Sequence, residues 1–195
     1  MPLRSKTRPA ESATRRQILD VAERLAQTAG FNGFSYADIA QQVGITKASL
    51  HYHFPTKAEL GLELIERYAA FFNAALKEID LRHAAARVRL EDYVKLYAEV
   101  LRGKRMCLCG MLAAEHATLP APMQDGLRRF FDLNERWLAK VLAAGRNDGS
   151  LEFRGSASEE GRLLLGALEG AMLVAHSYGD VKRFEAAARR LIRTL

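Results

Sequence analysis

The sequence predicts an all-α protein, with an N-terminal three-helix helix-turn-helix unit followed by a larger helical part. Apolar residues recur at helical spacing, and no convincing segment alternates with a period of two. Capping signals precede several expected helices, and glycines follow others. The chain has 195 residues, 49% of them hydrophobic, which is enough for a sizeable core.

The charge is positive and unevenly distributed. The net charge is +6 and the sequence pI is about 9.5. Residues 1–57 contain eight Lys/Arg against four Asp/Glu, so the basic bias concentrates near the N-terminus and fits an anionic partner. Two cysteines argue against a secreted disulfide framework and favour the reducing cytosol. We expect a cytoplasmic protein, because the N-terminus lacks the apolar run of a signal peptide and segment 161–175 is too short to span a membrane.

The N-terminal unit begins with a basic stretch, residues 1–11, which is expected to be a mobile arm able to touch phosphates. The first helix, ended by Gly30, shows apolar residues at i, i+4, i+7, i+8 and i+11, namely Ile18, Ala22, Leu25, Ala26 and Ala29. Ser35 and Asp38 form a capping box that opens the second helix. Gly44 ends that helix where a left-handed residue is needed.

Thr46 is expected to cap a third helix that runs to His53, with Leu50 and Phe54 on its inward face. Its outward side chains are small, aromatic, hydrogen-bonding or cationic: Lys47, Ala48, Ser49, His51 and Tyr52. Such a set suits a DNA major groove, where base edges and phosphates are both met. The alternative is an ordinary solvated face, but the glycine turn, the two caps and the inward spacing occur together and favour DNA.

A further capping box, Thr56 to Glu59, predicts a helix over 57–79. Lys57 lies in its first turn, where a cation is unfavourable for the helix dipole unless a phosphate binds at the helix end. The remaining apolar stripes predict helices at 90–101, 106–118, 124–144, 158–178 and 181–192. Segment 158–178 is apolar almost all round, so it must be covered on two sides.

The N-terminal third closely resembles the TetR family of bacterial transcriptional regulators. The matching positions are 22–30, 34–35, 39–40, 43–47, 49–50, 53–54 and 56–57, and the chain departs at His51, where the family usually has Tyr. The resemblance implies a homodimer with a DNA-binding domain at residues 1–56 and an effector-binding and dimerisation domain at 57–195. The implied DNA-facing residues are Ser35, Thr46, Lys47, Ala48, Ser49, His51, Tyr52 and Lys57.

The resemblance also implies a mechanism. Two copies would read half-sites about 34–36 Å apart on a palindromic operator at the nucleoid, and a small-molecule effector would release repression. Helices 124–144 and 158–178 would pair with their mates in a four-helix dimer interface. A helical small-molecule-binding or stress-sensing protein with a vestigial DNA-binding stretch is the alternative. An enzyme or a cofactor is not expected, because no catalytic constellation stands out.

Segment 104–115 resembles the subgroup that responds to electrophiles through a cysteine. Lys104 and Arg105 are expected to lower the pKa of the Cys107 thiol, although a small buried core residue is the alternative for this cysteine. The other effector candidates, which could also be core or surface residues, are Cys109, Tyr97, Met111, His116, Trp137 and Glu169. A metal site at the two cysteines and His116 is disfavoured, because Cys-x-Cys on a helix directs the sulfurs apart.

Overall fold

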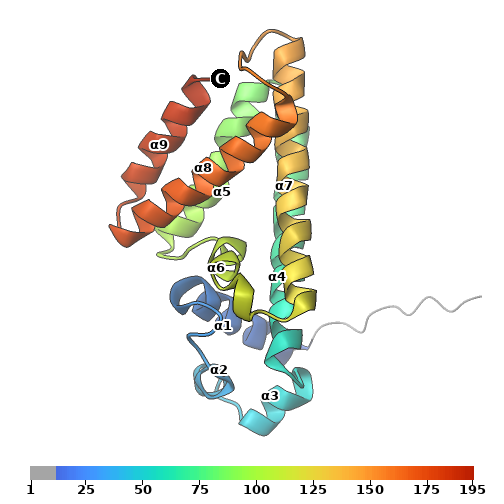
Figure 1. Cartoon of the computed structure of the whole chain (residues 1–195). Helices are drawn as coiled ribbons and strands as arrows, with labels where there is room; N and C mark the ends of the chain where they lie inside the picture. The colour runs from blue at the N-terminus through green and yellow to red at the C-terminus, as the bar shows by residue number, and fades with distance from the viewer. Residues whose placement is uncertain (1–11) are drawn as a thin grey trace, which may run out of the picture.

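The computed structural model describes residues 12–195, so the predicted basic arm at 1–11 lies outside the described residues (Figure 1). The described chain contains α-helices and one short 3-10 helix, with no strand, which confirms the all-α prediction. The helices are α1 (Ala13–Ala29), α2 (Tyr36–Val43), α3 (Lys47–His53), α4 (Lys57–Arg82), α5 (Ala86–Arg102), α6 (Leu108–Ala114), α7 (Ala121–Asn147), α8 (Ala157–Ser177) and α9 (Val181–Arg193).

Helices α1 to α3 form the small unit at one end of the molecule (Figure 1). The predicted capping box is present, because the Ser35 amide donates to Asp38 Oδ2 at 2.7 Å and the Ser35 hydroxyl accepts from the α2 backbone. Gly44 then ends α2 with a left-handed φ of 76°. Ile18, Ile39 and Leu50, one from each helix, are fully buried and form the centre of this unit.

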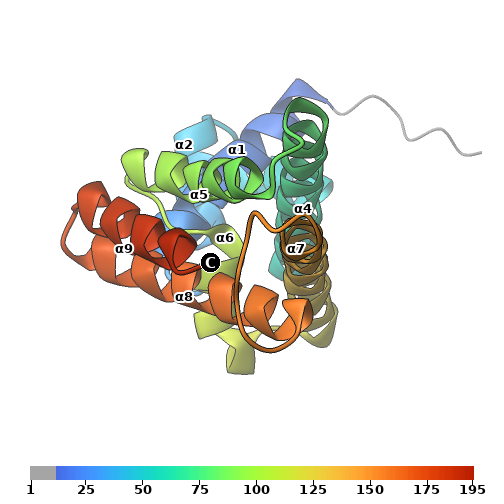
Figure 2. The ribbon, with the colours of Figure 1, turned by 90° about the horizontal axis from the view of Figure 1, so that it is seen from above.

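The two long helices, α4 and α7, lie side by side and carry the rest of the fold (Figure 1). Thr56 caps α4 by accepting from the Glu59 amide at 3.1 Å, as predicted. Tyr68 and Phe72 of α4 meet Phe130 of α7, with ring centroids 5.6 and 5.2 Å apart respectively. Seen along the long axis, α5, α8 and α9 pack to one side of this pair (Figure 2).

Helix α8 is buried on one side and open on the other. Its inner side packs on α7 and α9, and Gly161 allows a close approach, because a Cβ there would lie 3.2 Å from the Ala139 backbone nitrogen. Its outer side leaves Leu163, Leu173 and Val174 more than half exposed. The single chain therefore buries only one of the two sides of this helix that the sequence predicts to be covered. No helix of the described chain combines the length and the apolar character that a membrane crossing requires.

The predicted helix over 106–118 is wrong in extent. Helix α6 covers only Leu108–Ala114, and a 3-10 helix follows at His116–Thr118. Lys104 has a positive φ of 55° in the preceding turn, and Cys107 is the N-cap, its Sγ accepting from the Gly110 amide at 3.4 Å. A thiol is not among the preferred caps, so the start of α6 carried no sequence signal.

Candidate functional site

The outward face of α3 is open, as its sequence predicts. Lys47, Ala48 and His51 are exposed, Ser49 is half-buried, and Tyr52 is 85% exposed. An aromatic ring this exposed contributes little to the folded core, so it is free to contact a partner. The Thr46 hydroxyl is used as the α3 cap, where it accepts from the Ser49 amide at 3.1 Å.

His51 and Ser35 are exposed but already have contacts within the chain. The His51 ring lies 4.8 Å from the Tyr36 ring, and its Nδ1 is 3.3 Å from the Pro55 carbonyl oxygen. Tyr36 in turn donates to the Phe54 carbonyl at 2.9 Å, which fixes the end of α3 against α2. The Ser35 hydroxyl donates to Asp38 Oδ2 at 2.8 Å. These contacts orient α3 relative to α2 and leave the Nε2 edge of His51 available.

Lys57 lies in the first turn of α4, as predicted, and its side chain turns toward the loop between α1 and α2. Its ammonium donates to the carbonyls of Phe31 and Phe34 and lies over both rings, 4.7 and 4.2 Å from their centroids. Burial lowers the pKa of this half-buried lysine, although Glu115 and Asp38 raise it. The side chain therefore holds the loop between α1 and α2, and the phosphate contact expected for it stays a prediction.

Glu115, at the C-terminal end of α6, holds the same loop from the other side. Its carboxylate accepts from the Phe31 amide at 2.7 Å and from the Asn32 amide at 3.1 Å. Gly30 is required there, because it has a φ of 82° and a Cβ would lie 2.8 Å from Glu115 Oε1. The carbonyls of the loop accept from Lys57 of α4, and the amides of the loop donate to Glu115 at the end of α6. Both helices therefore hold the loop that leads into α2.

The opposite end of α6 meets a buried polar cluster. Glu169 of α8 reaches the start of α6, where a Cβ on Gly110 would lie 2.5 Å from its Oε2. Burial raises the pKa of Glu169 to about 7, and the neighbouring Cys107 thiol and Tyr97 hydroxyl lower it only in part. Within the described chain, Glu169 Oε1 and Tyr68 Oη are buried without a hydrogen-bond partner. Unpaired buried polar atoms are costly, so they mark a place where a ligand could supply the missing partners.

The cluster continues through the tyrosines of α5 to α7. The Tyr93 hydroxyl lies 3.0 Å from the Tyr97 hydroxyl and donates to Asn134 Oδ1 at 3.0 Å. The Tyr93 ring stacks on Trp137, with centroids 5.4 Å apart, and Trp137 Nε1 is a further buried donor without a partner in the described chain. The cluster therefore combines mainly aromatic surface with a few polar groups, a mixture that small-molecule sites share.

The prediction for the Cys107 thiol is wrong in sign. Burial raises its pKa well above the usual value, and the nearby Glu169 raises it further. Neither cation counteracts this, because Lys104 is exposed in the turn and Arg105 donates to Gln27 Oε1 at 3.0 Å. Burial likewise raises the pKa of the fully buried Cys109 thiol. Both cysteines are neutral thiols at neutral pH.

Comparison with known proteins identifies the family of this chain. The family model described as "Bacterial regulatory proteins, tetR family" matches residues 18–64. A TetR-family transcriptional regulator from Agrobacterium tumefaciens superposes with a TM-score of 0.92 at 31% identity, over 95% of this chain and 99% of that chain. The chain belongs to the TetR family.

Other TetR-family relatives agree with this. A TetR regulator from Legionella pneumophila superposes with a TM-score of 0.86 at 31% identity, over 94% of this chain and 98% of that chain. The HTH-type transcriptional repressor NemR from Escherichia coli K12 is 23% identical, over 94% of this chain and 96% of its own length. The protein is a ligand-responsive, DNA-binding transcriptional regulator, as the sequence predicted.

The effector candidates of this TetR regulator separate into two groups. The structure brings Cys107, Tyr97 and Glu169 together. Trp137 lies next to them, because the Tyr93 ring contacts both Tyr97 and Trp137. Met111 is half-buried against the core, whereas His116 is exposed in the 3-10 helix. Among the described residues, no group of three or more His, Cys, Asp or Glu side chains could hold a metal ion.

Sequence reasoning missed three members of the cluster, Tyr68, Tyr93 and Asn134. Asn134 is fully buried on the inner face of α7 between Phe130 and Trp137. A polar residue in the middle of an apolar stripe was the available signal, because such a residue needs a buried partner. The two tyrosines gave no comparable signal, since tyrosine is common in ordinary cores.

Proposed function

We propose that this TetR regulator represses transcription as a homodimer on a palindromic operator and is released when a small molecule enters the cluster around Cys107 and Glu169. The observation that carries the proposal is the position of α6. One end of α6 touches the buried cluster, and the other end holds the loop that leads into α2 and α3. A displacement at one end therefore changes the position of the DNA-binding helices.

On the DNA side, α3 enters the major groove with Lys47, Ala48, Ser49, His51 and Tyr52 toward the bases and phosphates. Support comes from their exposure and from the family membership. Ser35 and Thr46 contribute from the caps of α2 and α3. Lys57 is left out of this surface, because its ammonium donates to the Phe31 and Phe34 carbonyls. The protein acts in the cytoplasm, at the nucleoid.

The dimer forms through α8 and the adjacent face of α7. The support is the exposed apolar strip of α8, formed by Leu163, Leu173 and Val174. Gly166 and Gly170 lie on the same helix, and a Cβ added at either position would meet no atom of the described chain within 4 Å, so a second helix can approach closely. Burying such a strip stabilises a dimer by about 25 cal/mol for each Å² of apolar surface removed from water.

The effector is a small carbonyl compound with a reactive double bond. The support is the pairing of a buried thiol with a carboxyl whose pKa is raised to about 7, so that Glu169 can accept the thiol proton near neutral pH. In the reaction, the Cys107 sulfur bonds to the β-carbon and the π electrons of the C=C bond move toward the carbonyl. The thiol proton passes to Glu169 and then to the α-carbon, so atoms and charge balance. Because Cys107 is fully buried, the reagent must open the cluster, and the adduct keeps α6 displaced.

The test uses a fluorescent duplex from the region upstream of the protein's own coding sequence. Methyl vinyl ketone should release the wild-type protein and the Cys109→Ser variant, whereas Cys107→Ser should stay bound. Butanone, which lacks the double bond, is the matched control and should release none of them. Equal release of Cys107→Ser would reject the thiol as the sensor, and no salt-sensitive, sequence-specific binding would reject the repressor.

A further inference from the structure

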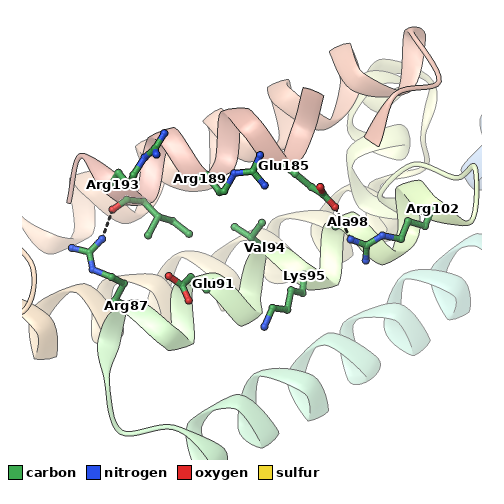
Figure 3. Close-up of a pocket in the computed structure, with 10 residues that line it drawn as sticks. Arg87, Glu91, Val94, Lys95, Ala98, Arg102, Glu185, Arg189 and Arg193 are labelled. Carbon is green, nitrogen blue, oxygen red and sulfur yellow. Dashed lines mark hydrogen bonds and ion pairs between the residues drawn. The ribbon is translucent and has the colours of Figure 1, made fainter. Parts of the chain in front are cut away.

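A groove lies between α5 and α9, on the part of the molecule opposite to α2 and α3 (Figures 1 and 3). Its volume is about 500 Å³, which lies within the range of small-molecule sites. It shares no residue with the α3 surface or with the cluster around Cys107. The residues that line it are Arg87, Glu91, Val94, Lys95, Ala98, Arg102, Glu185, Arg189, Ile192 and Arg193.

The walls of this groove are strongly positive. Five of the lining side chains are cationic and two are carboxylates. Arg102 pairs with Glu185 at 2.5 Å and Lys95 pairs with Asp92 at 2.6 Å, so these two cations already have partners. Arg189 and Arg193 are exposed, lie four residues apart on α9, and form no ion pair or hydrogen bond with the described residues. Two guanidinium groups at that spacing share one helix face and repel each other unless an anion lies between them.

The floor of the groove is apolar. Ala98 of α5 and Ile192 of α9 are buried, and Val94 lies half-buried between the cationic walls (Figure 3). Arg87 donates to the Ile192 carbonyl at 2.8 Å, which ties the end of α9 to α5 and holds the groove in shape. An inorganic anion could use the walls of such a groove but not the floor. An uncharged apolar molecule could use the floor but not the walls.

We propose that the groove between α5 and α9 binds an amphiphilic organic anion, a small carboxylate with an aliphatic body. The carboxylate is held by Arg189 and Arg193, because a guanidinium presents paired donors that match its two oxygens. The aliphatic body covers Val94, Ala98 and Ile192. Glu91, an exposed carboxylate on the opposite wall, opposes the ligand charge and weakens binding. This site is independent of operator binding and of the effector proposed for the Cys107 cluster.

Calorimetric titration of the full chain, without DNA, tests the proposal with three probes. Octanoate has both the charge and the chain, acetate has only the charge, and 1-octanol has only the chain. Octanoate should bind at least about tenfold more tightly than either of the other two, since only octanoate engages both walls and floor. Equal binding of octanoate and acetate would show that the groove is a non-specific basic surface, and would overturn the proposal. The absence of octanoate binding would overturn it as well.

Matched variants place the ligand in the groove. The double variant Arg189→Ala/Arg193→Ala should weaken octanoate binding by at least about tenfold, through the loss of charge-assisted hydrogen bonds. Lys182→Ala/Arg190→Ala removes the same charge from exposed positions of α9 outside the groove, and should leave binding unchanged. Glu91→Gln should strengthen binding. Equal losses in the two double variants, or binding undiminished in the first, would show that octanoate binds elsewhere and overturn the assignment.

Discussion

Gln27 of α1 and Met106, the residue before the α6 cap, exchange two hydrogen bonds. The Met106 amide donates to the Gln27 carbonyl at 3.1 Å, and Gln27 Nε2 donates to the Met106 carbonyl at 3.0 Å. Gln27 is only 1% exposed, and its Oε1 also accepts from Arg105. The residue next to Cys107 is therefore joined directly to the first helix of the DNA-binding unit, which supports a route from the cluster to α1 that does not pass through α4.

Replacing Gln27 by Ala should weaken this connection. We expect the free energy of unfolding to fall by about 1–3 kcal/mol, because the Met106 carbonyl and Arg105 lose a buried partner. Operator affinity without effector should stay close to wild type, while the release caused by an effector becomes smaller. Thr28→Ala is the matched control, since the exposed Thr28 hydroxyl bonds only within α1. Chemical denaturation and effector titrations check both effects, and full release by the Gln27 variant would contradict the proposed route.

The two lysines near α3 should act on different properties. Lys57→Met removes the ammonium from the Phe31 and Phe34 carbonyls, so we expect a loss of about 1–3 kcal/mol in the free energy of unfolding. Lys47 is exposed and forms no hydrogen bond or ion pair with the described residues, so Lys47→Met should leave stability within about 0.5 kcal/mol. Its effect should be on DNA, where losing one phosphate contact makes the slope of log affinity against log salt shallower by about one unit.

Salt titrations of operator binding and denaturation of both variants provide the check. A shallower salt slope for Lys57→Met together with unchanged stability would instead support the phosphate contact that was predicted from the position of Lys57 in the first turn of α4.

The sequence predicted the structural features that neighbouring residues determine. Ser35, Thr46 and Thr56 cap the helices that they were expected to cap, and Gly44 ends α2, because caps and left-handed turns depend on neighbouring residues. The inward positions of Leu50 and Phe54 follow from the helical period alone.

Sequence reasoning failed where the direction of a side chain depends on distant segments. Lys104 and Arg105 adjoin Cys107 in the chain, but the turn at Lys104 and the bond from Arg105 to Gln27 direct their charges elsewhere. The residue that sets the environment of Cys107 is Glu169, which follows it by more than sixty positions in the sequence. Without the packing of α6 against α8, the sign of the pKa shift of the Cys107 thiol could not be derived.

Tyr52 should contribute to DNA binding and not to stability. Because its side chain is 85% exposed, Tyr52→Ala should leave the free energy of unfolding within about 0.5 kcal/mol of wild type. Operator affinity should fall by about 1–3 kcal/mol if the ring contacts a base edge. Leu81→Ala is the matched control, since Leu81 is 83% exposed at the far end of α4. Anisotropy titrations measure the affinities, and equal affinity of Tyr52→Ala and wild type would remove Tyr52 from the interface.

Leu173→Glu should dissociate the dimer proposed for α8. The leucine is 59% exposed in the single chain, and a symmetric interface would bury it twice and bring two carboxylates together. We expect the dimer dissociation constant to rise at least about 100-fold, because burying a leucine is worth about 1.5–3 kcal/mol. Leu81→Glu places the same charge at an exposed leucine of α4 and should remain dimeric. Analytical ultracentrifugation decides, and an unchanged dimer in Leu173→Glu would reject this interface.

Glu169 should make stability depend on pH. Its pKa is raised from 4.5 to about 7 by burial, so between these values the folded chain binds more protons than the unfolded chain. The free energy of unfolding therefore falls as pH rises from about 4.5 to 7, and the penalty for burying the carboxylate is complete above about pH 7. A shift of this size corresponds to a loss on the order of 3 kcal/mol.

Glu169→Gln removes this titration while keeping the shape of the side chain. Denaturation midpoints measured from pH 5 to pH 8 should fall more steeply for wild type than for Glu169→Gln, so that the variant gains relative stability as pH rises. Glu160→Gln is the matched control, because Glu160 lies in the first turn of the same helix, outside the cluster. If wild type and Glu169→Gln show parallel pH profiles, the carboxyl of Glu169 has an ordinary pKa and is a weaker base toward the Cys107 thiol than the proposal requires.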